Sequence, residues 1–432
     1  MKKKPFVVIA ILHIVLVIID MIVFNYQQTS DSPRYLFVAD EFASFKWNHL
    51  DPVMNSNTAP GYPLFLAIIK LITHHNKFAI AIIQSVLYCY SLFVLLNELH
   101  KKVLITYTIA ILSFILILFC PEIFQSNEWT MRESLCGTCI LLIAASFVNE
   151  FQDRWAGIAL IISSSLLAFT RFEYFALIPF IYLFLIKEKR LKLFVSGVLT
   201  VVFPLVLNGY KNYLTFDKFT CLDVGSWSVV YGGNNLNGDA AWHVPEDNYD
   251  YFPKDQIKNY KTINLLDAKR SRIKEDSLYK ALVFQAWQKG PISQIKLIPL
   301  KFLRLLVIPA GMDIYTSTPG FQKGLMIGLL FNDRYWPWYA KYKHGFFFFV
   351  HWLYLLLIGF GIYLKKKYYT LSSFDKMIIY LFVLMSLLYS IIFHGLSRYH
   401  VPIFGLLLLF VPYSIQFLDK KILKGRIEKI TP

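Results

Sequence analysis

An acidic segment after the first apolar stretch of the chain carries side chains that can take up a proton. The segment, residues 31–41, reads DSPRYLFVADE, and its Pro33 suits the first turn of a helix capped by Asp31 or Ser32. In that helix Asp31 and Tyr35 lie on one face, because residues four apart are neighbours on a helix. A carboxylate held in this way can act as a general base towards a hydroxyl group. In the simpler alternative, Asp31 only caps the helix.

Basic residues near the ends of other apolar stretches could bind an anion. They are Arg171, His394 and Arg398, with Arg34 inside the acidic segment. Arginine can hold a phosphate through two parallel hydrogen bonds. An ionisable group at the centre of a bilayer costs about 2.5–3.5 kcal/mol, so such groups are seldom retained without a role. The alternative is that these arginines snorkel, with their stems covering apolar surface.

Three further polar residues have both a functional and a structural interpretation. Glu133 opens an apolar stretch, where it could orient an arginine or bind a sugar, or simply favour the positive end of a helix. Asn234 and Asn235 follow two glycines and suit recognition of sugar hydroxyls, although Gly/Asn clusters usually form turns.

The composition shows where these side chains must be held. The 432 residues are 56% hydrophobic and 17% charged, whereas a soluble protein has about a quarter charged residues. The apolar residues occur in blocks of about 15–22, the length that crosses a bilayer. The chain is therefore expected to be an all-α polytopic membrane protein. An ordinary cytosolic enzyme, a disordered chain and a disulfide scaffold are excluded.

The apolar blocks predict ten membrane spans. An interfacial helix is expected at 61–73, and a second at 291–312, where Lys296, Lys301 and Arg304 interrupt the apolar pattern at helical spacing. These spans divide the chain into three parts. They are an N-terminal membrane module (1–210), a large loop (211–344) and C-terminal spans with a basic tail (345–432). The ten spans lie at about 6–24, 77–98, 103–120, 134–149, 155–170, 172–186, 193–210, 345–364, 376–393 and 400–418.

Charge sets the expected orientation. The net charge of +16 comes from lysine and arginine clusters beside alternate spans, which favours a cytoplasmic location for that side and argues against a nucleic-acid surface. Both termini are then cytoplasmic, in a cell (inner) membrane. The first loop, 25–76, and the large loop, 211–344, are extracytoplasmic. Cys136 and Cys139 form a CxxC pattern inside an apolar stretch and are interpreted as plain buried thiols, not as a metal or redox site.

The order of these motifs resembles the GT-C superfamily, multi-spanning glycosyltransferases that use polyprenyl-phosphate sugars and include aminoarabinose transferases and protein O-mannosyltransferases. The resemblance covers about residues 1–250 and 390–405. Its motifs are Asp31-x-x-x-Tyr35-x-x-x-Ala39, Ala59-Pro60-Gly61-Tyr62-Pro63, Met131-Arg132-Glu133, Thr170-Arg171, Gly232-Gly233-Asn234-Asn235 and Ser397-Arg398-Tyr399-His400-Val401-Pro402.

The resemblance implies inverting sugar transfer from a polyprenyl-phosphate donor to an extracytoplasmic glycan, lipid or protein acceptor. Asp31 is the implied base, supported by Glu133, while Arg171 and Arg398 are the implied phosphate clamp. Arg34, Tyr35, Asn234, Asn235 and His394 are supporting candidates for substrate binding. The donor is a substrate, so no cofactor and no metal are expected.

The sequence departs from the family pattern at two places. His400 stands where a second basic residue is commoner, and the first loop has no Asp-x-Asp, which leaves the metal-dependent branch of the family without support. The pair Asp40 and Glu41 could replace Asp31 as the acidic group that family members use. Asp31 is preferred because Tyr35 follows it in register.

Two other classes of protein have part of this pattern. A transporter or flippase for lipid-linked sugars would place charged or Gly/Pro-broken segments at mid-span, often in two matching halves. The predicted spans are nearly free of such charges, and the two halves do not match. An O-antigen-type polymerase also has many spans and a large external loop, but does not require the acidic segment directly after the first span.

Overall fold

The computed structural model describes residues 1–23, 31–45, 50–73, 76–150, 153–176, 178, 182, 191–234, 268–307, 338–392 and 399–423. Within these ranges the chain is helical and contains no strand. Helices satisfy every backbone polar group internally, which is what a chain surrounded by lipid requires. The predicted all-α class is therefore confirmed for the described part.

Six helices are long and apolar enough to cross a membrane, and each coincides with a predicted span. They are α1 (Lys4–Val23), α5 (Lys77–Lys101), α11 (Leu191–Phe216), residues Phe348–Tyr368 of α18 (Trp338–Tyr368), α19 (Ser373–Ile391) and the apolar run Val401–Leu418, which comprises α20 (Val401–Leu407), η7 (Leu408–Phe410) and the start of α21 (Val411–Leu423). The protein is thus a multi-pass membrane protein.

The total of ten spans stays a prediction. Helices α6 (Tyr107–Leu118) and α7 (Pro121–Glu128) pass the same test only as a pair, and they are bent by 58° at the break between them. Pro121 at the first turn of α7 explains the break, because a proline cannot continue the hydrogen-bond ladder of the preceding helix. The apolar helices α8 (Arg132–Val148) and α9 (Arg154–Thr170) have 17 residues each, and most of 172–186 lies outside the described residues.

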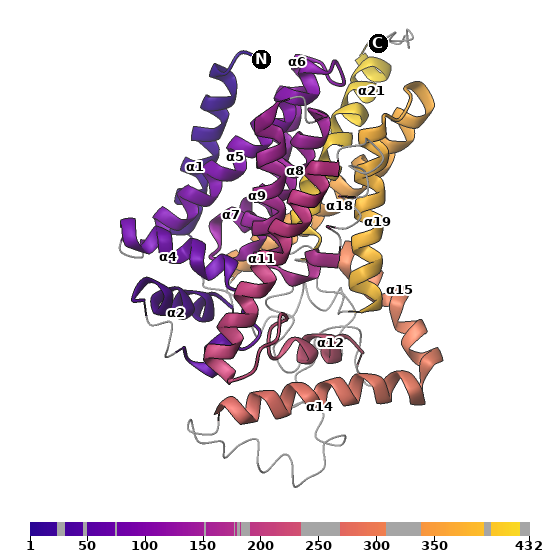
Figure 1. Cartoon of the computed structure of the whole chain (residues 1–432). Helices are drawn as coiled ribbons and strands as arrows, with labels where there is room; N and C mark the ends of the chain where they lie inside the picture. The colour runs from indigo at the N-terminus through magenta and orange to yellow at the C-terminus, as the bar shows by residue number, and fades with distance from the viewer. Residues whose placement is uncertain are drawn as a thin grey trace.

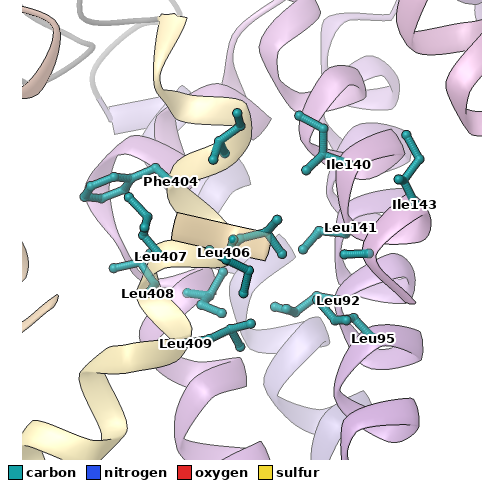
Figure 2. Packing of buried hydrophobic residues seen from close by; sticks show 14 of the residues in the cluster. Leu92, Leu95, Ile140, Leu141, Ile143, Phe404, Leu406, Leu407, Leu408 and Leu409 are labelled. Carbon is teal, nitrogen blue, oxygen red and sulfur yellow. The ribbon is translucent and has the colours of Figure 1, made fainter. Parts of the chain in front are cut away.

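The centre of the bundle is formed by α5, α8 and the run Val401–Leu418. Figure 2 shows Leu92 and Leu95 of α5 and Leu141 of α8 facing Leu406 and its neighbours. The extent of burial distinguishes this centre from the periphery. In Val401–Leu418, 78% of the 18-residue apolar stretch is buried inside the protein, whereas the corresponding share is 22% in α1 and in α11. The apolar side chains that α1 and α11 leave exposed are the surface expected to meet lipid.

The two ends of the bundle differ. Helix α1 begins and α21 ends at one end, while α2 (Ser32–Ala43), α3 (Pro52–Asn55), α12 (Ser226–Asn234) and α14 (Ala268–Lys289) gather at the other (Figure 1). Helix α4 (Gly61–Thr73) packs on α2, and α15 (Pro291–Val307) packs on α14 and α19. The end that carries α2, α12 and α14 is the one that the charge pattern predicts to be extracytoplasmic.

Candidate functional site

The acidic segment folds as predicted, but Asp31 does not cap its helix. Helix α2 begins at Ser32, and Asp31 occupies the N-cap position without a side-chain cap hydrogen bond. Its carboxylate instead pairs with the guanidinium of Arg34, 2.8 Å away. Asp31 is half-buried, whereas Tyr35, on the same face, is buried. The carboxylate is therefore held by a neighbouring cation and is not used to start the helix.

Helix α2 is attached to the turn that precedes α8. The Ser32 hydroxyl donates a hydrogen bond of 3.1 Å to the carbonyl oxygen of Thr130, and both residues are buried. Thr130 lies three residues before Glu133. Two motifs separated by 98 residues in the sequence are in this way brought to the same place.

Tyr35 lies between these two motifs. Its ring packs edge-to-face on Tyr62, with centroids 5.3 Å apart. Burial raises the pKa of the Tyr35 phenol; the charges of Arg132 and Arg34 oppose this rise, and those of Asp31 and Glu133 add to it. Tyr35 therefore senses the charges of both the α2 segment and the start of α8.

Arg171 is the most deeply buried cation in the described part of the chain. It directly follows α9 and is 0% exposed, with its guanidinium 3.4 Å from the carboxylate of Glu133. The guanidinium carbon also lies 4.4 Å from the centre of the Tyr399 ring, a cation–π contact. Tyr399 in turn stacks on Tyr389 at 4.6 Å. Residues from α8, α9, α19 and the start of α20 therefore converge on one arginine.

The polar atoms of this ion pair are left without hydrogen bonds. Among the described residues, none of the three guanidinium nitrogens of Arg171 and neither carboxylate oxygen of Glu133 has a hydrogen-bond partner. A buried polar group without a partner costs about 1–3 kcal/mol, and more when it is charged. A phosphate at this position would supply acceptors to the guanidinium, in the geometry that arginine favours.

Arg132 is a second cation in the cluster, and sequence analysis did not single it out. It lies within electrostatic range of Tyr35, Glu133 and Arg171. The signal was present, because Arg132 directly precedes Glu133 in a family-like motif. Glu133 was expected to orient an arginine, without a choice between the candidates, and the structure places Arg132 beside it in sequence and Arg171 across the fold.

Gly61 sets the distance between this cluster and α4. A Cβ atom at Gly61 would lie 2.6 Å from the carbonyl carbon of Phe169 and 2.7 Å from the backbone nitrogen of Thr170. The start of α4 therefore contacts the last turn of α9 closely enough that only glycine fits. Because Arg171 is the next residue, this contact helps to fix where its guanidinium lies.

A small apolar pocket lies beside the charged cluster, between α8, α19 and α20. One of its walls is Tyr174, which is buried and within electrostatic range of Arg171. The other walls come from Ile140, Ile143, Ala144, Phe147, Leu167, Met377, Leu381, Ile403 and Leu406. The pocket is about the size of a water molecule, so it is a small gap in the apolar packing beside Tyr174.

Asn234 positions a further buried cation, Lys301. The Asn234 amide nitrogen donates to the carbonyl oxygens of Val230 and Ile392, at 2.6 and 2.7 Å, and its side-chain oxygen accepts from the Lys301 amine at 3.3 Å. Burial lowers the pKa of Lys301 to about 8. The structure therefore gives Asn234 a positioning role, and its contact with a sugar stays a prediction. Lys301 was expected only to interrupt the apolar pattern of its helix.

Lys301 and Arg171 are connected through the end of α19. Ile392, which accepts the Asn234 bond, lies three residues after Tyr389, whose ring stacks on Tyr399 under Arg171. The remaining predicted site residues, Asn235, His394 and Arg398, lie outside the described residues.

Asp40 and Glu41, the alternative candidates for the base, both bind other residues of the protein. Glu41 accepts hydrogen bonds from the backbone nitrogen of Asp51 and the side-chain nitrogen of Asn55, both at 2.7 Å. Asp40 forms an ion pair with Lys70 of α4. Glu41 therefore shapes the loop between α2 and α3, and Asp40 ties α2 to α4.

The two loops predicted to be extracytoplasmic are joined by a buried lysine. The Lys211 amine donates to the carbonyl oxygen of Thr58 at 2.8 Å and lies 3.2 Å from the carboxylate of Asp223. The backbone nitrogen of Asn57 also donates to the carbonyl oxygen of Val224 at 2.6 Å. These bonds fix the family-like motif at 59–63 against the segment that leads into α12.

Three other side chains form the only group in the described residues with the composition of a metal site. Glu122, His351 and His400 are all buried, and one potential ligand atom from each lies within 4.8 Å of the others. From the sequence no metal was expected, and His400 was only a departure from the family pattern. Cys136 and Cys139 are free and buried, so the expected burial of these thiols is confirmed.

Comparisons with family models, with curated proteins and with solved structures find no match to this chain. The site therefore has to be interpreted from its own geometry.

Proposed function

We propose that this protein is an extracytoplasmic, inverting glycosyltransferase of the GT-C type that uses a polyprenyl-phosphate sugar. The observation that carries the proposal is the buried guanidinium of Arg171. It has no hydrogen-bond acceptor among the described residues, although it is 3.4 Å from Glu133 and lies over Tyr399. Such a group is prepared to receive an anion, and the hydrogen bond from Ser32 to Thr130 brings the segment of Asp31 to the start of α8, where Glu133 pairs with Arg171.

The proposed reaction uses Asp31 as the general base. As the acceptor oxygen forms its bond to the anomeric carbon, the hydroxyl proton passes to the Asp31 carboxylate. The bond between the anomeric carbon and the phosphate oxygen breaks, and the electron pair leaves with polyprenyl phosphate. Attack opposite to the leaving group inverts the anomeric centre.

Cations stabilise the phosphate as it leaves. Arg171 and Arg132 carry fixed positive charge into a buried site, where electrostatic stabilisation is strongest. Glu133 orients Arg171 through the ion pair and does not itself transfer the proton. Arg398 and Lys301 are assigned to the same clamp, Arg398 on the basis of the sequence motif and Lys301 because of its link through Asn234.

The position of the cluster supports a lipid-linked donor. Arg171 directly follows the apolar helix α9 in a bundle of membrane-spanning length, so a polyprenyl chain could stay in lipid while its phosphate meets the guanidinium.

The test is transfer by the purified full-length protein in liposomes that contain polyprenyl-phosphate sugars. We expect Arg171→Gln to lose about 10- to 100-fold in transfer, since a hydrogen bond to a charged group contributes about 1.5–3 kcal/mol. Arg272→Gln is the matched control, because Arg272 pairs with Glu275 on α14, outside the site.

The same preparation separates the rival functions. Lipid-linked sugar that crosses the bilayer without being transferred would identify a flippase. Joining of whole lipid-linked oligosaccharides, without use of monosaccharide donors, would identify a polymerase. Equal transfer by the wild type, Arg171→Gln and Arg272→Gln would remove Arg171 from the donor site.

A further inference from the structure

We propose that Glu122, His351 and His400 form a binding site for one divalent metal ion of the zinc class. The site is independent of the transferase proposal, because it rests on other residues. Glu122 lies in α7, His351 in α18, and His400 directly precedes α20. All three side chains are at most 1% exposed.

The spacing of the ligand atoms is close to that of a coordinated ion. One oxygen of Glu122 lies 2.8 Å from Nδ1 of His351, and the other lies 2.8 Å from Nε2 of His400. Ligands about 2.0–2.1 Å from a tetrahedral zinc ion are about 3.3 Å from each other. The ligand atoms, one from each residue, lie within 4.8 Å of one another, so the widest separation has to shorten by up to about 1.5 Å and the shortest has to lengthen by about half an ångström to admit the ion.

The chemistry of the ligands selects the metal. Two imidazoles and one carboxylate are borderline ligands, which suit zinc and its neighbours and are a poor match for magnesium or calcium. Three protein ligands leave a fourth coordination position open, as in zinc sites that bind water or a substrate. The ion would hold α7, α18 and the start of α20 together.

One imidazole already has the supporting hydrogen bond that metal ligands usually make. Nε2 of His351 lies 2.7 Å from the carbonyl oxygen of Leu306, so this nitrogen donates and Nδ1 faces Glu122. Metal-binding histidines almost always donate their other ring N–H in this way, which fixes the ring and its tautomer. Nδ1 of His400 has no such partner among the described residues.

Nδ1 of His351 has no hydrogen-bond partner among the described residues, although it lies 2.8 Å from the Glu122 carboxylate. A metal ion at this nitrogen would leave the bond from Nε2 to Leu306 intact. Burial of the three groups also means that the ion is taken up as the protein folds and is exchanged slowly.

The experiment measures metal content and does not depend on enzymatic activity. Full-length protein is produced in zinc-supplemented cells, purified in detergent, dialysed against a chelator and analysed by mass spectrometry for metals. We expect about one zinc ion per chain in the wild type and in His100→Asn, a control histidine of α5 outside the site. Glu122→Gln and His400→Asn should lose the ion, because each removes a ligand.

A second measurement covers variants that fold poorly. Wild-type protein produced with cobalt in place of zinc should show the visible absorption bands of four-coordinate Co²⁺. His400→Cys, which retains a ligand at this position, should add a sulfur-to-cobalt charge-transfer band. Wild-type protein without bound metal and without the cobalt bands would overturn the site. Equal metal content in the wild type, Glu122→Gln and His400→Asn would also overturn it, because the ion would then lie elsewhere.

Discussion

The hydroxyl of Ser32 donates a 3.1 Å hydrogen bond to the carbonyl oxygen of Thr130, and this bond brings the proposed base to the proposed phosphate clamp. Ser32 is the neighbour of Asp31, and Thr130 precedes Arg132 and Glu133 by two and three residues. A general base and a phosphate clamp must lie on the two sides of one reacting centre. The hydrogen bond between Ser32 of α2 and Thr130, in the turn before α8, brings the two groups of residues close together.

Asp31→Asn should reach the membrane at normal levels and lose transfer by about 10²–10⁴-fold, the usual contribution of a general base. The substitution keeps the shape of the side chain and removes its charge. Donor binding should persist, as measured by retention of polyprenyl phosphate in native mass spectrometry. Asp40→Asn and Glu41→Gln should have milder effects on turnover per folded molecule, because their carboxylates hold loop structure. Near-normal turnover in Asp31→Asn with collapse in either of the others would move the base to the acidic pair.

Gly61→Ala should lower both stability and transfer. Its Cβ would collide with the backbone of Phe169 and Thr170, and such overpacking typically costs about 1–3 kcal/mol. Gly359→Ala is the matched control, since nothing lies within 4 Å of a Cβ there and alanine favours a helix by up to about 1 kcal/mol. Thermal unfolding in detergent measures both. Equal midpoints for the two variants would show that the close contact between α4 and α9 is not maintained.

We expect the rate at which the donor is used to depend on pH, because of Lys301. Because burial lowers its pKa to about 8, the free enzyme has a charged Lys301 below that pH and loses the charge as the pH rises through it. The value of kcat/KM, which reports groups of the free enzyme, should therefore fall above about pH 8. Lys301→Arg should move the fall to higher pH, because arginine stays protonated.

Two variants on the same helix complete this test. Lys301→Met should have a low kcat/KM without the fall above about pH 8. Lys296→Met, which removes an exposed lysine of α15, should keep the wild-type profile. A wild-type fall that persists in Lys301→Met would assign the dependence to another group.

The orientation of the bundle should follow the charge pattern. In a background that lacks Cys221, a cysteine at Phe219 should react with a membrane-impermeant maleimide added from outside the cell. A cysteine at Val103, beside Lys101 and Lys102, should react only after the membrane is opened. Both positions are exposed in the structure. The reverse pattern of labelling would invert the protein and place α2 on the cytoplasmic side.

The sequence predicts the helices well because each one depends on local signals. Apolar runs of spanning length gave six long helices, and Pro33 correctly marked the first turn of α2. Arg171 was correctly expected at the end of α9. The residue pattern alone did not decide whether Asp31 caps the helix, because the Arg34 guanidinium, three residues on, competes with the backbone for the same carboxylate.

The sequence could not predict which interaction partners each polar group has in the folded protein. Lys301 follows the polar face of an amphipathic pattern, yet it is buried because α12 and α19 cover it through Asn234. Glu122 and His400 are 278 residues apart, and no spacing rule connects them. Arginines beside apolar spans looked alike in the sequence. Only packing distinguishes the fully buried Arg171 from those that reach water.

The separation of Glu122 from its histidines also affects how the protein is made. At about 5–20 residues per second, roughly 15 to 55 s pass between synthesis of Glu122 and synthesis of His400. Until His351 is made, 229 residues after Glu122, the acidic group of α7 has neither of its histidine partners. The last helices to be made therefore complete the interior of the bundle, and a chain that stops before His351 leaves the buried acid Glu122 without either of its histidine partners.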